Sequence, residues 1–238
     1  MKVVILAGGK GTRLAPYTNV FPKPLIPIGD MPILEVVIRQ LKSCGFDEII
    51  LAVGYMADLL RAYCKDGERY GVKIDYSVED SPLGTAGPLA LIPGLENTFI
   101  VMNGDVLTTL DYRDLVQFHR RKQAVATIAM YKRLVKIDLG VIQCNGYQEV
   151  VGYIEKPVYH FTVSMGIYVF EPRVLHYIEP GEYLDFPDLV IRLLDHKERV
   201  MAYPYDGYWL DIGRLDDYQQ AVEEFEKMRP HLLYEAKE

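Results

Sequence analysis

The chain opens with an apolar strand that runs directly into a glycine-rich loop. Val3–Leu6 contains no polar residue, and Ala7 is followed by Gly-Gly-Lys-Gly at positions 8–11. A strand without polar positions is buried on both faces, as in parallel α/β sheets. Glycines directly after such a strand predict a loop at its carboxyl end, the edge where open α/β sheets bind ligands. The opening segment therefore predicts an α/β fold with a binding loop after its first strand.

Strand-like and helical segments alternate through the first half of the chain. An apolar i, i+3, i+4, i+7 pattern over 34–41 predicts a helix that ends before Gly45. Further strands are expected at 48–53, 73–78 and 98–102, and further helices near 57–64 and 85–91. This alternation predicts a doubly wound parallel sheet with right-handed crossovers.

The strand pattern changes after a helix that we expect near 112–122. An apolar run at 125–130 is followed by closely spaced strand-like segments with short turns such as Asn145-Gly146, which predicts a small antiparallel β insertion. Those segments span 141–143, 150–155 and 163–170, and helices are expected near 186–194 and 214–227. Because only that last helix and a charged tail follow Gly213, we expect no second folded domain.

Composition excludes several classes of partner. The formal net charge is −7 and no run of five basic residues occurs, which disfavours nucleic acid or an anionic membrane as a partner. Cys44, Cys64 and Cys144 are odd in number and show no C-x-x-C spacing, so neither disulfides nor a zinc site is expected. The apolar opening is too short for a signal peptide or a membrane span. These features predict a protein of the cytoplasm.

The glycine loop and two nearby cations indicate phosphate binding. Glycines let backbone N–H groups approach phosphate oxygens, and Arg13 adds a planar cation that can bind an oxyanion through two hydrogen bonds. Lys23 is flanked by two prolines, which stiffen the backbone and fix the direction of its ammonium group. The loop is not a Walker A motif, because Thr12 follows the last glycine, and Leu14 breaks the Rossmann fingerprint. For the glycines alone, a simple turn after a core strand remains the alternative.

The segment from Leu6 to Pro27 resembles the signature of the sugar-1-phosphate nucleotidyltransferases, G-G-x-G-T-R-L-x-P-x-T followed by P-K-P-L. The resemblance implies that Arg13 stabilises phosphate charge and that Lys23 contacts the reacting phosphates. It also implies that the loop wraps a nucleoside triphosphate. The loop residues concerned are Leu6, Ala7, Gly8, Gly9, Gly11 and Thr12.

The resemblance extends over nearly the whole chain and implies one domain over 1–238. Its fold would be α/β, a Rossmann-like doubly wound mixed sheet with a nucleotide-binding half at about 1–110 and a sugar-binding half at about 111–225. Base and nucleotide recognition would involve Glu79, Pro82, Gly84, Thr85, Ala86, Asn103 and Gly104. Without the resemblance, the segment 79–89 is a loop followed by the start of a helix.

The same resemblance assigns a metal site and a sugar-phosphate site. Asp105 and Asp211 would bind Mg²⁺, for which carboxylate oxygens are suitable ligands. The sugar phosphate would contact Gly140, Glu155, Lys156, Ser164 and Gly166. Taken alone, Asp105 would be a cap or turn residue, and Glu155-Lys156-Pro157 would be a strand that ends at a proline. Ser164 departs from the asparagine common in the family, so the identity of the sugar stays open.

The reaction implied by the resemblance couples a nucleoside triphosphate to a sugar 1-phosphate and releases pyrophosphate. Val53–Met56 and Phe118–Arg120 look most like the GDP-mannose pyrophosphorylases, which favours GTP with mannose 1-phosphate or a heptose 1-phosphate. The alternatives are a uridylyl-, thymidylyl- or cytidylyltransferase for glucose 1-phosphate and a non-catalytic nucleotide-sugar sensor. A metal-dependent glycosyltransferase is a further alternative, but Gly104-Asp105-Val106 lacks its usual Asp-x-Asp. A homodimer is compatible with the sequence.

Overall fold

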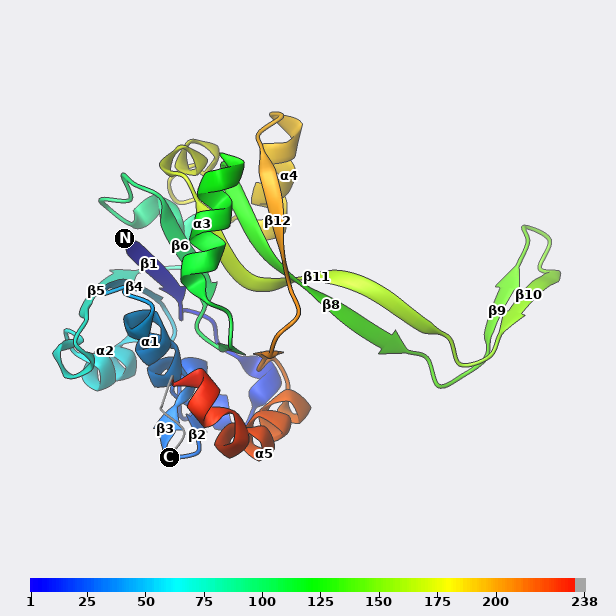
Figure 1. Ribbon diagram of the computed structural model, residues 1–238, viewed down its shortest axis with the longest axis horizontal. Helices are drawn as coiled ribbons and strands as arrows, with labels where there is room; N and C mark the ends of the chain where they lie inside the picture. Colours follow the sequence, from blue (N-terminus) through cyan, green and yellow to red (C-terminus); the bar gives the residue numbers. More distant parts are fainter. Residues whose placement is uncertain (234–238) are drawn as a thin grey trace.

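The computed structural model describes residues 1–233, which form a mixed seven-stranded sheet flanked by helices (Figure 1). The sheet order is β12-β8-β11-β6-β1-β4-β5. Its strands are β1 (Lys2–Leu6), β4 (Glu48–Val53), β5 (Lys73–Val78), β6 (Phe99–Asn103), β8 (Ala126–Lys136), β11 (Val158–Phe170) and β12 (Val200–Tyr205). The α-helices are α1 (Ile33–Ser43), α2 (Ala57–Cys64), α3 (Tyr112–Lys122), α4 (Phe186–Asp195) and α5 (Leu215–Leu232).

Strand β1 lies at the centre of the parallel part of this sheet. It pairs in parallel with β4 on one side and with β6 on the other, and β5 adds in parallel to β4. Strand β11 is the antiparallel member, between β6 and β8. The predicted α/β fold with a doubly wound mixed sheet is therefore confirmed, and the parallel strands bring their carboxyl ends to one edge.

Helices cover both faces of the sheet because β1 alternates its buried side chains between two cores. Val3 and Ile5 pack with residues of α1, α2 and α3, whereas Val4 packs with residues of α4 and of the 3₁₀ helix Gly87–Leu91. All three side chains are fully buried. This two-sided burial explains why the first strand contains no polar position.

A third core attaches the last helix to the end of the sheet. Phe225 of α5 packs with Leu14, just after the glycine loop, and with Leu210 of β13 (Trp209–Asp211). Strand β13 pairs antiparallel with β7 (Val106–Thr108). The same core includes the two-residue strands β2 (Pro27–Ile28) and β3 (Met31–Pro32). Helix α5 thereby fixes β13 beside the loop that follows β6.

Three predicted elements differ from the structure. The helix expected near 85–91 is a short 3₁₀ helix over Gly87–Leu91, because Gly87 lies against the carbonyl of Glu182 and Pro88 lacks an N–H group. The strands expected at 125–130 and 163–170 are longer, as β8 continues to Lys136 and β11 begins at Val158. Both extensions have solvent on two faces, so they lack the apolar alternation that predicts a strand.

These extensions form an arm, residues 132–163, that projects from the body of the protein (Figure 1). Strands β8 and β11 continue as a two-stranded ribbon from the sheet, and the hairpin of β9 (Val141–Cys144) and β10 (Val150–Ile154) lies at the far end. The predicted antiparallel insertion is therefore present as a projecting arm.

No helix in the described part of the chain is both long enough and apolar enough to cross a membrane. Cys44 and Cys64 are buried and unbridged, and Cys144 is exposed on the arm. Burial raises the pKa of the Cys64 thiol to about 12, which keeps it protonated and unreactive.

A buried histidine links α3 to the sheet. His119 is 1% exposed, and its two ring nitrogens hydrogen-bond to the Thr127 hydroxyl at 2.8 Å and to Glu171 at 3.0 Å. Burial lowers the pKa of His119, although the hydrogen bond to Glu171 opposes the shift. The folded state therefore binds a proton at this ring less readily than the unfolded chain does.

We predict that His119 makes the free energy of unfolding fall in acid. An unfolded histidine titrates near pH 6.5, so the stabilisation is complete above that pH and is lost as the pH falls toward the folded pKa. The loss should be up to about 1.4 kcal/mol per pH unit. Urea unfolding between pH 7.5 and 5.5 should show this slope for the native chain and a smaller slope for His119→Gln. Equal slopes would contradict the account.

Candidate active site

A cavity of about 910 Å³ opens at the carboxyl edge of the parallel strands. Its volume is within the range of about 300–1,000 Å³ typical of small-molecule sites. It is lined by the glycine loop, by the ends of β1, β4 and β6, and by the segment that follows β5. Many of the nucleotide-binding residues predicted from the sequence meet here. Those that line it are Leu6, Ala7, Gly8, Gly9, Gly11, Thr12, Arg13, Lys23, Glu79, Pro82, Gly84, Thr85, Asn103 and Asp105.

The glycine loop is held by backbone bonds to the strands on both sides of β1. The N–H of Ala7 donates to Ala52 at 2.8 Å, the N–H of Tyr55 donates to Gly8 at 3.1 Å, and the N–H of Gly104 donates to Leu6 at 3.0 Å. These bonds fix the loop on β4 and β6. The loop is therefore a preformed wall of the cavity.

Gly11 is the turning point of this loop. Its φ is +61°, a left-handed conformation, and a Cβ there would lie 2.9 Å from Thr18 Cγ2 and 3.1 Å from Lys23 Cβ. The Thr18 hydroxyl donates to the Gly11 carbonyl at 3.0 Å. Only glycine combines this backbone conformation with such close neighbours. The turn thus brings the loop against the segment that carries Lys23.

Charged groups gather where the glycine loop, β6 and β13 meet. The Lys23 ammonium forms an ion pair with Asp105 Oδ2, and both side chains are largely buried. Asp211 faces the same cluster and is solvent-exposed. The surrounding protein atoms raise the pKa of Asp211 despite this exposure, and the negative charge of Asp105 raises it further. The charges of Lys23 and Arg13 act in the opposite direction.

Asp105 and Asp211 suit a hard cation such as Mg²⁺. Asp105 Oδ1 is buried without a hydrogen-bond partner among the described residues, and the repulsion between the two carboxylates would be relieved by a cation. No group of three His, Cys, Asp or Glu side chains that could hold a metal exists in residues 1–233. Mg²⁺ typically takes one or two carboxylates and completes its shell with water and phosphate. The pair therefore fits a metal that binds together with a nucleotide.

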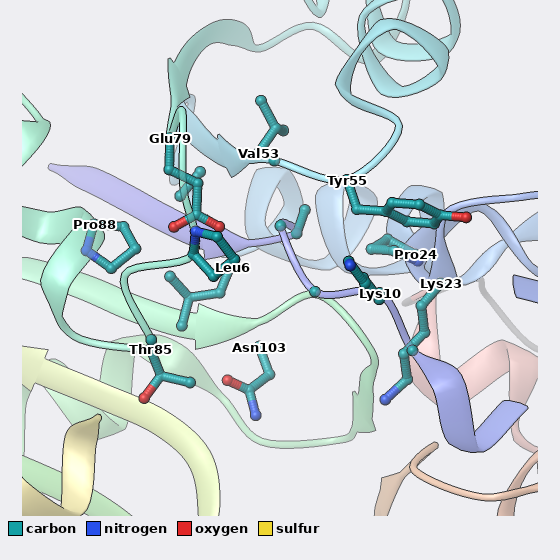
Figure 2. A pocket seen from close by; sticks show the side chains of 18 of the residues that line it. Leu6, Lys10, Lys23, Pro24, Val53, Tyr55, Glu79, Thr85, Pro88 and Asn103 are labelled. Carbon is teal, nitrogen blue, oxygen red and sulfur yellow. The ribbon is translucent and has the colours of Figure 1, made fainter. Parts of the chain in front are cut away.

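The opposite end of the cavity is formed by the segment after β5. The side chains of Glu79, Thr85 and Pro88 lie at this end, and those of Lys10, Lys23 and Tyr55 lie at the other (Figure 2). The cavity is thus polar and cationic at one end and has an acidic group at the other.

Hydrogen bonds fix the acidic end of the cavity. Glu79 Oε2 accepts the N–H of Leu83 at 3.1 Å, and Glu79 Oε1 lies over Gly8. Asp185 accepts the backbone N–H of Thr85 at 2.9 Å and its hydroxyl at 3.1 Å. These bonds hold the segment against α4, which explains why a loop here keeps a defined shape.

The structure places a second group of predicted residues beside the cavity. Asn103 lines it, and its amide packs against Gly166, whose φ is +72° and where a Cβ would lie 2.6 Å from Asn103 Nδ2. The Ser164 hydroxyl donates to Tyr168 at 3.0 Å and accepts the N–H of Gly166 at 3.2 Å. Ser164 therefore shapes the bulge of β11 that presents Gly166.

Several predicted residues lie outside the cavity lining. Ala86 is fully buried, and Gly104 forms the turn after β6. Gly140, Glu155 and Lys156 lie on the arm, away from the cavity of the same chain (Figure 1). The structure thus brings the predicted nucleotide residues together but separates them from part of the predicted sugar-phosphate residues.

Some residues of the cavity were not predicted. Lys10 lies within the glycine loop, so its position in the motif was a signal for it. Tyr55 lies in Val53–Met56, which pointed to a group of relatives but was not assigned to the site. The full set of unpredicted lining residues is Lys10, Pro24, Ala52, Val53, Gly54, Tyr55, Ser77, Asp80, Ser81, Pro88 and Leu91. Most of them lie at or just after the carboxyl ends of β4 and β5, a position that only the strand order reveals.

Known proteins share this arrangement over most of the chain. A family model described as nucleotidyl transferase matches residues 2–228. The UTP–glucose-1-phosphate uridylyltransferase of Synechocystis sp. is 38% identical, over 93% of this chain and 62% of that protein. The mannose-1-phosphate guanyltransferase of Yarrowia lipolytica is 36% identical, over 92% of this chain and 62% of that protein. The chain therefore spans about 62% of the length of these relatives.

A solved structure agrees with the sequence comparisons. The crystal structure of HddC from Yersinia pseudotuberculosis complexed with GMP-PN superposes with a TM-score of 0.72 at 27% identity. The match covers 94% of this chain and 99% of that one. The fold, and sequence similarity over most of the chain, are therefore shared with one group of proteins.

We predict that Gly11→Ala destabilises the protein more than Gly9→Ala does. An alanine at position 11 would occupy a left-handed conformation, which costs about 1–2 kcal/mol, and its Cβ would press on Thr18 and Lys23. At Gly9 a Cβ meets no atom within 4 Å, so the change in unfolding free energy should stay within about 0.5 kcal/mol. Urea unfolding of both variants measures the difference, and equal losses would contradict the role given to Gly11.

Proposed function

This chain belongs to the nucleotidyl transferase family, and we propose that it transfers a nucleotidyl group from a nucleoside triphosphate to a sugar 1-phosphate. The observation that carries the proposal is the cavity in which a glycine loop and three cations, Lys10, Arg13 and Lys23, meet Asp105, with Asp211 beside them. Such a site neutralises phosphates at one end and leaves room for a nucleoside at the other.

The proposed reaction is a direct displacement at the α-phosphorus. An oxygen of the sugar phosphate forms a new P–O bond to the α-phosphorus, while the bond to the bridging oxygen breaks and its electrons leave with pyrophosphate. The attacking phosphate is ionised at neutral pH, so no strong general base is required. The main barrier is the approach of two anions, which positioning and positive charge can lower.

Three cations of this chain are placed to lower that barrier. Arg13 and Lys10 lie on the loop that would surround the triphosphate, and Lys23 lies beside Asp105. Asp105 and Asp211 would hold Mg²⁺, which supplies further charge neutralisation when bound. We assign Arg13 and Lys23 to the reacting phosphates and the loop backbone to the rest of the triphosphate.

The sugar side of the proposed site begins at Asn103 and Gly166. Asn103 lines the cavity, and Gly166 packs closely against its amide, so these two residues mark the side of the cavity nearest β11. Glu155 and Lys156 complete the assignment, with the carboxylate binding sugar hydroxyls and the ammonium binding the phosphate. Because both residues lie on the projecting arm, this assignment requires the arm of a chain to reach an active-site cavity.

We favour GTP as the nucleotide. One oxygen of the Glu79 carboxylate is bound by the Leu83 N–H, and the other lies over Gly8 at the base end of the cavity. A carboxylate can accept hydrogen bonds from N1–H and the 2-amino group of guanine, whereas uracil offers a single N–H donor. The sugar would be mannose 1-phosphate or a heptose 1-phosphate. Transfer of UMP, dTMP or CMP to glucose 1-phosphate is the second candidate, supported by the identity to the Synechocystis uridylyltransferase.

Pyrophosphate release tests the proposal directly. The purified chain with Mg²⁺ is assayed with GTP, UTP, dTTP, CTP and ATP, each against mannose, glucose and heptose 1-phosphates. Release that requires both substrates, highest with GTP, is the expected result. Nucleotide binding without turnover in any pair would instead support the non-catalytic sensor, and sugar transfer from a nucleotide sugar without pyrophosphate would support a glycosyltransferase.

We predict that Arg13→Ala and Lys23→Ala each lower kcat by about 10²- to 10³-fold, the usual effect of losing one transition-state donor. Lys73→Ala is the matched control, because this lysine is 71% exposed and pairs with Asp75 outside the cavity. Circular dichroism of each variant confirms folding. Unchanged turnover in Arg13→Ala or Lys23→Ala would remove that residue from the mechanism.

We predict that Glu79→Gln reduces the preference for GTP over UTP. A hydrogen bond to a charged group contributes about 1.5–3 kcal/mol, which corresponds to about 10- to 100-fold in the ratio of kcat/KM values. The glutamine oxygen can still accept the Leu83 N–H, so the loop should keep its shape. Glu96→Gln, an exposed site outside the cavity, should leave the ratio unchanged. A constant ratio in Glu79→Gln would contradict guanine recognition by this carboxylate.

A further inference from the structure

We propose that the arm of one chain reaches the active site of a second copy and supplies Glu155 and Lys156 to it. The inference rests on the proposed function, because it gives these two residues to the sugar phosphate. In a pair related by twofold symmetry, each copy would donate one arm and receive the other. The complete site would then be built from two chains.

The direction of the arm is fixed by the sheet from which it grows. Strands β8 and β11 pair continuously from Val158 opposite Lys136 to Ser164 opposite Met130, and pairing resumes beyond a bulge at Tyr168. Strand β12 holds β8 in place as far as Tyr131. Folding the arm back onto its own cavity would break this ladder. The arm is therefore built to project, and no residue of it lines the cavity of its own chain.

The arm exposes an unusual amount of apolar surface for a projecting element. Tyr147 is 88% exposed and Leu139 is 74% exposed. Further exposed apolar side chains are Ile142, Val150, Val151 and Tyr153. Exposed apolar side chains concentrated on one element of a protein are typical of an interaction site. The arm therefore has the surface expected for one side of a protein–protein interface.

The residues proposed to bind the sugar phosphate lie at a bend in this arm. The ribbon of β8 and β11 gives way there to the hairpin of β9 and β10, and the Ile137 N–H donates to the Pro157 carbonyl at 3.0 Å. Glu155 and Lys156 are both exposed, and Lys156 has a φ of +42°. A lysine in the left-handed region is uncommon, and such conformations cluster at functional sites. The bend thus presents two charged side chains to solvent.

One face of the arm continues into the active site. Tyr159 and Phe161 lie on this face with ring centroids 6.3 Å apart, and the strand pairing places Tyr131 next along it. Tyr131 contacts Trp209 with ring centroids 5.2 Å apart. Trp209 lies two residues before Asp211 on β13, so both point to the same side of that strand. These aromatic side chains therefore form a strip that leads from the arm to Asp211. An arm of a second copy that packed on this strip would be directed toward the carboxylates of the site.

Charge and size also favour a second copy as the occupant. The arm carries four cationic and three acidic side chains, so it has a net charge of +1 in a chain of net −7, and the remainder carries −8. At roughly 3.3 Å per residue, the bend lies about 20 Å beyond the end of the sheet. An arm of this length can reach the cavity of a neighbouring copy. Stable interfaces involve about 20–30 residues on each side, which the arm segment 132–163 can provide.

Mixing two inactive variants tests the proposal. Lys156→Ala damages the arm, and Arg13→Ala damages the cavity. In a mixed pair, the intact arm of the Arg13→Ala chain would enter the intact cavity of the Lys156→Ala chain. Co-folding equal amounts should restore about a quarter of the native activity, because half of the pairs are mixed and each has one complete site. Arg13→Ala mixed with Lys23→Ala is the matched control and should stay inactive, since both changes lie in the cavity.

If the native chain is active and the first mixture is no more active than its two variants measured separately, the inference is overturned and the proposed function stays intact. If the native chain lacks activity, the proposed function fails, and a crosslinking test still decides where the arm lies. Cys144 is exposed on the arm, whereas Cys44 and Cys64 are buried, so a maleimide photocrosslinker should react at Cys144. Mixed isotope-labelled and unlabelled chains should give crosslinks from Cys144 to the cavity loops of the other copy. Crosslinks confined to one chain would overturn the inference.

Discussion

The parallel pairing of β1 with β4 and β6 is the interaction on which the rest of the site depends. It buries Val3, Val4 and Ile5 from both sides and brings the carboxyl ends of three strands to one edge. Backbone bonds from Ala7 and to Leu6 then hold the glycine loop against both neighbours. Because these bonds involve only the main chain, the loop keeps its shape while its N–H groups remain available to phosphate oxygens.

The charged groups of the site come from the two ends of the chain. The loop and Lys23 come from the first strand and the segment after it, whereas Asp211 is brought to them by β13 and the packing of Phe225 in α5. The chain is acidic overall, so cations gathered at one edge create a local reversal of sign where anionic substrates would bind. In this account, the packing of the last helix positions Asp211 near Asp105, with which it would bind the metal.

Sequence reasoning succeeded where burial imposes a pattern on the residues. Strands β4 and β5 and helices α2 and α3 begin and end at the predicted residues. After Glu48, strand β4 is a continuous run of apolar residues buried on both faces, and α2 and α3 each bury one apolar face. The glycine loop was predicted as a phosphate site from its glycines together with Arg13 and Lys23, and these residues do line one cavity. Asp211 was placed in the site only through the family resemblance, since no local pattern joins it to Asp105.

The projecting arm could not be predicted from the same patterns. Its strands have solvent on both faces, so the apolar residues Leu134 and Val135 follow each other without the alternation of a half-buried strand. The separation of Lys156 from the cavity of its own chain follows from strand pairing over long distances, which a single sequence does not display. Tyr55 was missed for a related reason, because its place in the site depends on the order of strands in the sheet.

The stereochemical course at the α-phosphorus tests the central claim most directly. The account holds that the site neutralises charge for one in-line displacement and that no group of the protein forms a bond to the nucleotide. A nucleoside triphosphate that carries sulfur at one defined position of the α-phosphate, used with the preferred sugar 1-phosphate, should give a product of inverted configuration. Retention would require two successive displacements through a covalent enzyme intermediate and would contradict the account.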